Sequence, residues 1–579
     1  MKNSNNLCTN VISANPFLFR ARPKPLYSSK QVYAIEQAWF AAGYNSFALM
    51  QQAAWQMAQY LIQHAHAQVE QRAQSLAATG TPISAVVWVG AGNNGGDGWL
   101  MSHYLFNVGW QVTIVDVGQI TISEDSPQDN DAAHAKTRAT KDLAAADNFT
   151  VIPFSEITTD KAKWHLSQAH YHIDALFGIG LDRAPTGQYV QAIHQFNTLT
   201  QSPDITAVAV DIPSGVVAST GQVFDDCAIR ADLTLCLVAS KVGLTIRDGI
   251  DHSGAVIDFP LIPYLNSPKA CAWQLHTALS MSPRQQNSHK GSYGHVMIIG
   301  GNQSAGAQGM GGAAIMSSGS ALASGAGKVT TACHTAFHGA LLTTHPNAMT
   351  VDLQQTETVD KLLAGVDVVA IGMGFGREEE ALALFKHYLQ TAITEKKPLV
   401  IDADGLYHLA TLRQDEDDLI EQLKAHAAHY QVCFTPHSGE AARLLDKEVG
   451  AIEADRLAAI RECAEIFGGD WLLKGPGSLV LIEDTCYVCA TGNPGMASAG
   501  MGDVLSGLLA GLMAQTDLPT EQRSLYQAVL IHGMAGDLRA HGKLKSSDSV
   551  ANKLAVGERG LQAHELLEAI GCVMNELNG

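Results

Sequence analysis

The chain has few basic residues and no long apolar run. Its 579 residues include 37 Lys and Arg against 56 Asp and Glu, a formal net charge of −19. Nucleic-acid binding depends on clustered Lys and Arg that release counterions from phosphates, so we expect no nucleic-acid partner. No stretch has the length and hydropathy of a membrane span, and residues 1–26 lack the apolar segment of a signal peptide. We therefore expect a cytoplasmic protein without a membrane partner.

Cysteine is also sparse. The ten cysteines have no framework spacing, which excludes a disulfide scaffold and is typical of reduced thiols. Cys486 and Cys489 form an isolated C-x-x-C in an apolar, strand-like run (residues 478–490). Residues three apart on a strand face opposite sides, and a structural zinc site needs four ligands. We expect no metal or redox role for this pair.

The residues that are present predict a folded α/β protein. Hydrophobic residues make up 46% and charged residues 16%, as in ordinary globular domains, and the length calls for more than one core. Short apolar runs alternate with helical patterns and glycine-bearing turns, which is typical of βα units with mostly parallel sheets. Examples are residues 85–89, 207–210, 296–299, 368–371 and 399–401.

Prolines suggest where the domains divide. Pro263, Pro268 and Pro283 interrupt every periodic pattern in their region. We expect a disordered tail at 1–26, a first domain at 27–263, a linker at 264–276 and a second domain at 277–579.

A glycine-rich loop follows the first predicted strand. Residues 90–98 read GAGNNGGDG and precede Met101, Tyr104, Leu105 and Val108, which are spaced as one face of a helix. Glycine allows close backbone approach to an anion, and a helix start offers unpaired N–H donors, so the loop predicts a phosphate site. A tight strand-to-helix turn also needs glycine, and this packing alternative stays open.

Two further strands of the first half end in aspartate. Asp174 and Asp211 each close an apolar run, and parallel strands bring such ends to one edge of the sheet. Asn94, Asp174 and Ser214 are hard oxygen ligands suited to K⁺, Na⁺ or Mg²⁺. Asp211 could act as a general acid or base. Alternatively, both aspartates only cap neighbouring turns.

These loops closely resemble those of the YjeF N-terminal domains, the NAD(P)H-hydrate epimerases. The resemblance covers roughly residues 27–263 and includes Leu49-Met50, the DIPSG motif at 211–215 and Lys241-Val242-Gly243-Leu244. It implies a Rossmann-like three-layer domain that interconverts the R and S epimers of hydrated NADH and NADPH. At the hydrated ring carbon a C–OH bond must break or form, which needs a proton moved at the hydroxyl while the ring nitrogen supplies electrons.

The same resemblance implies particular site residues. Asp211 would lie at the reacting centre, and K⁺ would be held by Asn94, Asp174 and Ser214. The hydrated dinucleotide would contact Asp211 and two loops, made of Asn93, Asn94, Gly95, Gly96 and Asp97, and of Gly178, Ile179, Gly180, Leu181, Asp182, Arg183 and Ala184.

In the second half, residues 500–507 read GMGDVLSG and open a predicted helix with Leu505, Leu508, Leu509 and Leu512 on its apolar face. Glycines at a helix start form an anion hole, and Asp503 inside it could take a proton from a hydroxyl that attacks a phosphate. The alternative is that Asp503 only complements the helix dipole.

This segment and others resemble the YjeF C-terminal domain, the ADP- or ATP-dependent NAD(P)H-hydrate dehydratase. The motifs are HKGSYGH (289–295), GMGFG (372–376), DADGL (402–406), TPHSGE (435–440) and KGPGS (474–478). The resemblance covers about residue 277 to the C-terminus and implies a ribokinase-like three-layer domain. Ser438 replaces the usual proline, and the loop at 302–312 is longer than in the family.

The second resemblance implies a kinase step followed by an elimination. Asp503 would be the base that lets the ring hydroxyl attack the terminal phosphoryl group of ADP or ATP, with Mg²⁺, after which phosphate leaves. The fused architecture resembles that of bacterial members, which implies ADP. The adenine nucleotide would contact Lys474, Gly475, Pro476, Gly477, Ser478 and Gly502, and the hydrated dinucleotide would contact Ala313, Gly374, His437 and Asp503.

The two resemblances together imply a bifunctional enzyme that repairs hydrated NADH and NADPH, and one that self-associates as its ribokinase-like and Rossmann-like relatives usually do. Two alternatives remain. The second half could be a ribokinase-like kinase for a vitamin alcohol, which would accumulate a stable phosphoester. The first half could be a binding module without catalysis.

Overall fold

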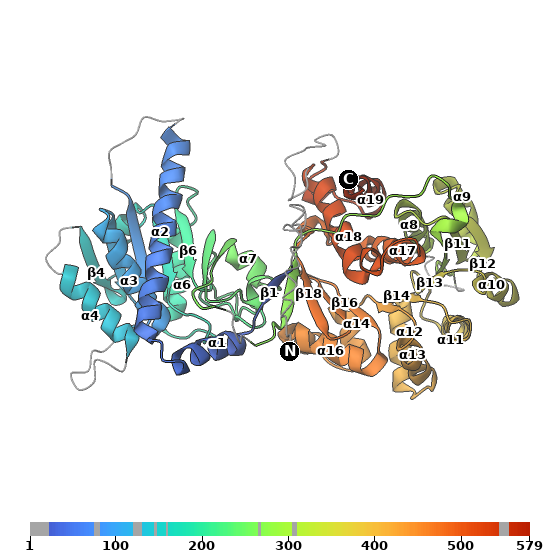
Figure 1. The fold of residues 1–579 in the computed structure, drawn as a ribbon, viewed down its shortest axis with the longest axis horizontal. Coiled ribbons are helices and arrows are strands. Elements are labelled where there is room, and N and C mark those ends of the chain that lie inside the picture. The colour runs from blue at the N-terminus through green and yellow to red at the C-terminus, as the bar shows by residue number, and fades with distance from the viewer. Residues whose placement is uncertain are drawn as a thin grey trace, which may run out of the picture.

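The computed structural model describes residues 23–73, 82–119, 130–143, 148–157, 160–263, 268–303, 310–542 and 555–578. Figure 1 shows two α/β units side by side, one formed by the first half of the chain and the other mainly by the second. Each unit is a sheet covered by helices on both faces, as the alternating pattern predicts.

The first unit contains a seven-stranded, all-parallel sheet with the order β4-β3-β2-β5-β6-β7-β8. The order reverses between β2 and β5, and open α/β sheets bind ligands at the carboxyl ends of strands beside such a switch point. The strands are β2 (Ser84–Val89), β3 (Gln111–Asp116), β4 (Phe149–Pro153), β5 (Tyr171–Ala175), β6 (Thr206–Val210), β7 (Leu233–Leu237) and β8 (Ala255–Phe259).

Alternation along β2 separates the two cores of this unit. Val87 and Val89 face one core and Val86 and Trp88 face the other, because successive side chains of a strand point to opposite sides. The first core lies under α1 (Ser29–Ala41), α2 (Ser46–Ala73), α3 (Asn93–Asn107) and α4 (Asp131–Leu143). The second lies under α5 (Asp160–Leu166) and α6 (Gln188–Leu199), and the short α7 (Gly249–Ser253) precedes β8.

The second unit contains an eleven-stranded sheet with the order β1-β9-β18-β17-β16-β15-β14-β13-β10-β11-β12. Neighbouring strands from β12 to β16 are parallel, and β16, β17 and β18 follow as an antiparallel meander. The strands are β10 (His295–Ile299), β11 (Lys328–Cys333), β12 (Met349–Asp352), β13 (Val368–Ile371), β14 (Leu399–Ile401), β15 (Val432–Phe434), β16 (Asp470–Leu473), β17 (Leu479–Ile482) and β18 (Thr485–Cys489).

Helices again divide this unit into two cores. On one face lie α8 (Gly311–Ala323), α17 (Met501–Ala514), α18 (Leu525–His541) and α19 (Leu566–Leu577). On the other lie α10 (Thr356–Leu363), α11 (Glu379–Thr394), α12 (Asp404–Gln414), α13 (Leu419–Ala427), α14 (Ser438–Leu445), α15 (Val449–Ala454) and α16 (Arg456–Phe467). The short α9 (His338–Thr344) follows β11. Cys486 and Cys489 face opposite cores, as expected for their spacing, and neither forms a disulfide with another described cysteine.

Two segments expected to lack structure form strands. Residues 24–26, placed in the disordered tail, form β1 (Lys24–Leu26), which pairs antiparallel with β9 (Ala272–Leu275) at the edge of the second sheet. That part of the prediction is wrong because Leu26 is fully buried in the core of the second unit. β9 itself lies inside the expected linker and pairs with β18. Residues 1–22 and 264–267 lie outside the described residues.

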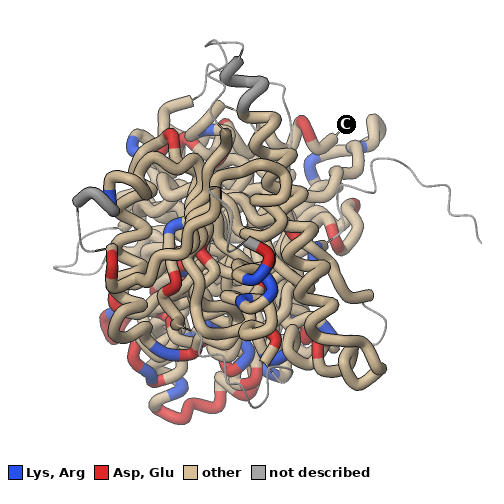
Figure 2. The backbone as a smooth tube through the Cα atoms, turned by 90° about the vertical axis from the view of Figure 1, so that its left-hand side faces the viewer, with Lys and Arg blue, Asp and Glu red and all other residues tan. Residues whose placement is uncertain are grey.

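The five strands expected at 85–89, 207–210, 296–299, 368–371 and 399–401 are confirmed, with bounds that differ by at most one residue. In Figure 2, which views the first unit end-on, Lys and Arg lie among Asp and Glu over much of this face. Within the described residues, the longest apolar helices fall short of what a bilayer crossing requires.

Candidate functional sites

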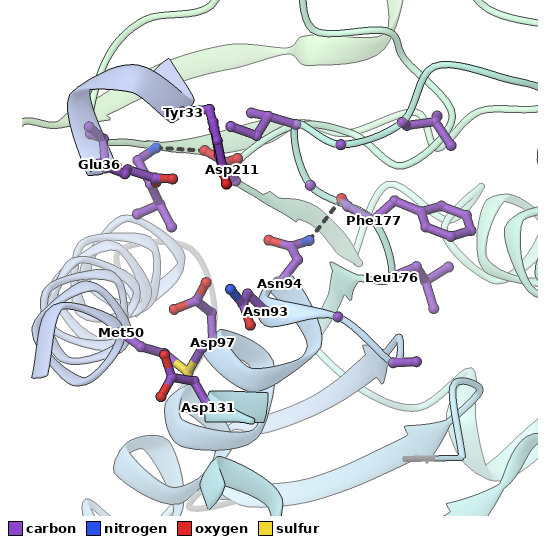
Figure 3. A pocket seen from close by; sticks show the side chains of 18 of the residues that line it. Tyr33, Glu36, Met50, Asn93, Asn94, Asp97, Asp131, Leu176, Phe177 and Asp211 are labelled. Carbon is purple, nitrogen blue, oxygen red and sulfur yellow. Dashed lines mark hydrogen bonds between the residues drawn. The ribbon is translucent and has the colours of Figure 1, made fainter. Parts of the chain in front are cut away.

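A cavity of about 670 Å³ opens at the switch point of the first sheet. Its walls come from α1, α2, the start of α3, the loop after β5 and the end of β6 (Figure 3). Asn93, Asn94, Asp97, Asp211 and all of Gly178 to Ala184 line it. The sequence motifs that were expected to converge are therefore brought together on one cavity.

Gly95 and Gly96 play a different part from their neighbours in the loop. Neither lines the cavity; a Cβ on Gly95 would lie 2.0 Å from the Gly90 carbonyl oxygen, and one on Gly96 would lie 2.8 Å from Sδ of Met50. These positions must be glycine so that the first turn of α3 can pack against β2 and α2. The packing explanation left open by the sequence holds for these two glycines, and their backbone contact with a ligand stays a prediction.

Asp211 is held at the cavity by a strained turn and a buried lysine. It follows β6 with φ of +67°, a left-handed conformation that is unusual outside glycine. Its Oδ1 accepts hydrogen bonds from the Lys241 ammonium and from the Leu237 backbone N–H at 3.1 Å. Its Oδ2 lies on the side of Gly178, where an added Cβ would be 3.6 Å away. One carboxylate oxygen is thus anchored, and the other is directed to the cavity.

Lys241 is buried, with 1% of its side chain accessible. Its ammonium also donates to the Leu237 carbonyl at 2.6 Å and to Sγ of Cys236 at 3.6 Å. Burial lowers the pKa of Lys241, but Asp211 and the other acceptors outweigh that effect and raise it above its usual value. Lys241 therefore carries a proton throughout the physiological range.

The three predicted cation ligands meet around one peptide group. Asn94 Nδ2 donates to the Phe177 carbonyl at 2.9 Å, and Ser214 Oγ accepts from the Phe177 N–H at 2.9 Å. The buried Asp174 accepts from Ser214 through both its backbone N–H and its hydroxyl, each at 2.7 Å. Burial raises the pKa of Asp174 to about 6, although the hydrogen bonds from Ser214 oppose it.

This arrangement suits a monovalent cation. Asp174 has only neutral hydrogen-bond donors among the described residues, so a cation would supply the charge that its burial leaves unbalanced. The nearby oxygens are the Asp174 carboxylate, the Ser214 hydroxyl and the Phe177 carbonyl, and Asn94 would have to turn its amide oxygen toward a cation because its Nδ2 now donates to that carbonyl. Hard oxygen ligands with a single negative charge fit K⁺ or Na⁺ better than zinc.

The cavity also contains acidic groups that hold protons unusually tightly. Asp97 is 8% exposed and its Oδ1 has no hydrogen-bond partner among the described residues. Burial, with the nearby charges of Asp211 and Glu36, raises its pKa well above the usual value. Glu36 on α1 lines the same cavity, and burial together with Asp211 raises its pKa to about 7.

In the second unit, Asp503 lies in the first turn of α17 and is surrounded by the other predicted residues. Ser317 Oγ donates to the Asp503 carbonyl at 2.9 Å and to the Ala313 carbonyl at 3.0 Å. A Cβ on Gly374 would lie 3.2 Å from that of Ala313. Burial, reinforced by Asp402, raises the pKa of the Asp503 carboxyl to about 7 although Lys474 opposes the shift.

Lys474 connects this helix start to a second buried aspartate. Its ammonium donates to Asp402 at 2.9 Å and lies 3.9 Å from Glu440. A Cβ on Gly502 would lie 3.1 Å from the same ammonium. Burial raises the pKa of Asp402, but Lys474 and hydrogen bonds such as that from Ser506 at 2.7 Å outweigh it and lower the pKa. Burial raises the pKa of Glu440 to about 7.

His437 joins the same group through its backbone and its side chain. It forms a β-bridge with Lys474, and its Nδ1 caps α14 by accepting from the N–H groups of Gly439 at 3.0 Å and Glu440 at 3.3 Å. Burial, then the charge of Lys474, lowers its pKa. His437 is therefore neutral at physiological pH.

Hydrogen bonds from Arg456 to backbone carbonyl groups hold the loop from Lys474 to Ser478. The buried Arg456 guanidinium donates to the carbonyls of Leu473 at 3.0 Å, Lys474 at 3.1 Å and Pro476 at 3.1 Å. The loop also contacts the first unit, where the Arg247 N–H donates to the Pro476 carbonyl at 3.3 Å. The residues predicted to bind the nucleotide thus form one rigid loop beside Gly502 and Asp503.

Family models divide the chain in the same way as the two sites. The model described as YjeF-related protein N-terminus matches residues 46–243, and that described as NAD(P)H-hydrate dehydratase matches residues 296–554. The chain is also similar to the bifunctional NAD(P)H-hydrate repair enzyme Nnr of Coxiella burnetii, with 32% identity over 84% of this chain and 90% of the relative. The chain belongs to the bifunctional NAD(P)H-hydrate repair enzyme family.

Other members and structures are similar to this chain over the same regions. The bifunctional NAD(P)H-hydrate repair enzyme Nnr of Vibrio cholerae is 34% identical over 83% of this chain and 86% of its own length. A crystal structure of a ribokinase-like superfamily protein from Enterococcus faecalis has 27% identity and a TM-score of 0.43, covering 52% of this chain and 92% of that one.

Four residues of the two sites were not predicted as functional: Glu36, Lys241, Asp402 and Glu440. Three of them stand within motifs that indicated the repair family, so their neighbours were the available signal. Glu36 lies before residue 46, where the match to the N-terminal family model begins. Only the packing of α1 over the cavity reveals it.

Proposed function

We propose that this chain repairs hydrated NADH and NADPH with two sites. The first unit interconverts the R and S hydrates, and the second dehydrates the S hydrate while consuming ADP or ATP. The observation that carries the proposal is that each half, matched by its own family model, places a partly buried aspartate among its motif loops. The vitamin-kinase alternative has no separate observation in its favour.

In the first site, Asp211 has the geometry of an acid–base group. Lys241 and the Leu237 N–H hold one oxygen, so the other can exchange a proton with the ring hydroxyl. The loops from Asn93 to Asp97 and from Gly178 to Ala184 would bind the dinucleotide. Oriented backbone N–H groups at the start of α3 suit its phosphates despite the acidic surroundings.

Asn94, Asp174 and Ser214 would hold K⁺ beside this site. A bound K⁺ would orient the Phe177 peptide and so fix the loop that starts at Gly178. Replacing K⁺ in the buffer by tetramethylammonium should slow R-to-S conversion, and Asp174→Asn should remove the response to K⁺. An unchanged rate in both salts would contradict this ligand set.

In the second site, Asp503 would act as base toward the ring hydroxyl. The hydroxyl oxygen then attacks the terminal phosphoryl group, and elimination of phosphate re-forms the ring double bond. Lys474 and the N–H groups at the start of α17 would stabilise the transferring phosphoryl group. Ala313, Gly374 and His437 would bind the dinucleotide, and Lys474 to Ser478 with Gly502 would bind ADP or ATP with Mg²⁺.

The test uses the full chain and a mixture of R and S NADH hydrates with ADP or ATP. We expect the absorbance of NADH to return for the whole mixture, with one inorganic phosphate released per NADH. Asp211→Asn should stop rapid conversion once the S epimer is consumed. Asp503→Asn should restore no NADH and still interconvert the epimers. A stable phosphoester in place of NADH would establish the kinase alternative.

A further inference from the structure

One face of α1 forms a wall of the first cavity. Tyr33, Glu36, Gln37 and Phe40 line the cavity, while Val32 and Ile35 of the same helix are buried in the core. The spacing i, i+3, i+4 and i+7 places the four lining side chains on one side of a helix. The Ser28 capping box with Gln31 fixes the start of α1, so the direction in which Glu36 points is set by the fold.

Glu36 is the acidic residue of this face, and it is close to the reacting carboxylate. Figure 3 shows its carboxyl group on the same side of the cavity as Asp211. Its charge acts on Lys241 and on Asp97 as well as on Asp211. Among the described residues, no hydrogen bond or ion pair engages the Glu36 carboxyl, so both of its oxygens are available to a ligand.

The charges of this cluster do not balance. Three carboxyl groups, Glu36, Asp97 and Asp211, share the single buried ammonium of Lys241, which is already bonded to Asp211, Leu237 and Cys236. Like charges at short range in a low-dielectric site cannot all be ionised, so the cluster retains protons near neutral pH. Asp97 and Glu36 both line the cavity, but Asp97 is only 8% exposed, whereas Glu36 is on the wall formed by α1 with a pKa of about 7.

When the hydroxyl leaves as water it needs a proton, and when water returns to the other face of the planar carbon it must lose one. Asp211 is paired with the ammonium of Lys241, whereas the Glu36 carboxyl has no such partner among the described residues and can supply the proton. We propose that Glu36 is a second catalytic residue of the epimerase site, an acid–base group that works together with Asp211. This inference rests on the epimerase activity proposed above.

The step balances without any further reactant. Protonated Glu36 gives its proton to the ring hydroxyl, the C–O bond breaks, and the ring nitrogen lone pair forms a C=N⁺ bond. Water then attacks from the opposite face, the new C–O bond forms, the electron pair returns to nitrogen, and the released proton reaches Asp211 through cavity water. In the reverse direction Asp211 donates and Glu36 accepts, and a proton exchange through cavity water restores the starting state.

The test compares Glu36→Gln with Glu156→Gln, an exposed position of the same unit away from the cavity, in the full chain with no nucleotide present so that the dehydratase is idle. Chromatography follows R-to-S conversion and ¹⁸O-labelled water follows exchange of the hydroxyl. For Glu36→Gln we expect turnover to slow by roughly a hundredfold or more with KM nearly unchanged, a parallel loss of ¹⁸O exchange, and partial recovery in Glu36→Asp. Glu156→Gln should stay within threefold of the unmodified chain.

The pH profile supplies a second readout. Conversion should decline above about pH 7 because Glu36 must be protonated to expel water, and Glu36→Gln should lose this limb. The other charged groups around the cavity are Asp97, Asp131, Asp182, Arg183, Asp211 and Lys241, and all are retained in the variant.

Several results would overturn the assignment of Glu36. They are a Glu36→Gln variant that turns over within threefold of the unmodified chain, a rise in KM alone, an unchanged pH profile, or conversion by the unmodified chain without ¹⁸O exchange. Dehydratase activity and thermal unfolding of the same samples verify that Glu36→Gln is folded. If the unmodified chain itself does not interconvert the epimers, the proposed function fails, and this is a different result from failure of the variant alone.

Discussion

At the level of single residues, each site pairs a lysine with an aspartate, and Lys241 is buried whereas Lys474 is partly exposed. Lys241 contacts Asp211 in the first unit, and Lys474 contacts Asp402 in the second. A buried charge is tolerated only while its partner and hydrogen bonds remain, so removing one member of such a pair typically costs about 3 to 5 kcal/mol. Both pairs therefore contribute to folding as well as to chemistry.

We predict that Asp402→Asn will lower the free energy of unfolding by about 3 kcal/mol, because the ammonium of Lys474 loses its counter-charge. The double variant Asp402→Asn with Lys474→Met should recover part of this loss, although both proteins lose dehydratase activity. Urea unfolding of the two single variants and the double variant measures the coupling. Strictly additive losses would show that the pair does not act as a unit.

The position of Asp503 lowers the stability of the folded protein when its carboxyl group is ionised. Its pKa is about 7 in the folded protein against about 3.9 for an unperturbed aspartate, so the folded state binds the proton more tightly. Stability should therefore fall as pH rises from about 4 to about 7, and the full cost remains above pH 7. Activity should change in the opposite sense, rising about tenfold per pH unit below 7 and levelling off above it, because the base must be ionised.

At pH 8 we predict that the free energy of unfolding of Asp503→Asn will exceed that of the unmodified chain by on the order of a few kcal/mol. The variant should therefore unfold at a higher temperature. This advantage should vanish toward pH 4. Asp415→Asn, at an exposed position, serves as the control for the loss of a carboxylate. An equal gain for Asp503→Asn at pH 5 and pH 8 would remove the basis of this argument.

Individual residues differed in how far the sequence could predict them. Asp211 and Asp503 stand in motifs at strand or helix ends; the structure places Asp211 on the cavity and Asp503 in the first turn of α17, and their catalytic roles stay predictions. Glu36 has no such signal, because its role depends on α1 folding back over the sheet from outside any βα unit. The glycines of the Asn93 to Asp97 loop share a motif, yet only the structure separates those that pack from the residues that line the cavity.

At the level of elements, the contact between α8 and α17 positions Asp503. Gly507 and Gly511 of α17 lie against α8, and a Cβ on Gly507 would be 1.9 Å from the Ser317 carbonyl oxygen. The same residue, Ser317, donates to the Asp503 carbonyl. The close approach of the two helices thus fixes the position of the first turn of α17 relative to α8.

We predict that Gly507→Ala will destabilise the second unit by about 1 to 3 kcal/mol, the usual cost of overpacking, and will reduce dehydratase activity by moving Asp503. Gly571→Ala is the matched control: it is a helical glycine in α19 with open space around it, and alanine there should be neutral or stabilising. Thermal unfolding and NADH recovery measure both effects. Equal behaviour of the two variants would show that the contact does not position the site.

Elements were the scale at which sequence patterns were most informative. Apolar runs bounded by glycine predicted strands such as β2, β13 and β14 because burial on both faces demands continuous hydrophobic residues. The strands β1 and β9 were missed, since three or four residues beside prolines carry no periodicity. Their structure comes from pairing with each other and with β18.

At the level of the whole molecule, residues from the first part of the chain also form part of the core of the second unit. Leu26, Val242 and Ile246 precede or belong to the first unit, yet they are buried in the core of the second. Arg247 forms an ion pair with Glu453 at 3.5 Å in addition to its backbone contact with Pro476. The linker predicted from prolines therefore does not separate the units completely.

We predict that a chain beginning at residue 27 will lose stability in its dehydratase half, because β9 loses its edge partner and the Leu26 side chain leaves the core. A chain beginning at residue 23 keeps β1 and should match the full protein. Thermal unfolding with and without ADP, together with NADH recovery from the S hydrate, compares the two. If both truncations behave alike, β1 has no structural role.

The position of β1 also constrains how this protein can be built. Because β1 precedes the first unit and completes the sheet of the second, the whole epimerase half is topologically an insertion between two adjoining strands. On the ribosome, β1 is synthesised about 250 residues before its partner β9, so the edge of the second sheet can close only late in translation. Splitting the gene at the prolines would leave β1 attached to the wrong polypeptide, and a separately expressed dehydratase would need that strand supplied from elsewhere.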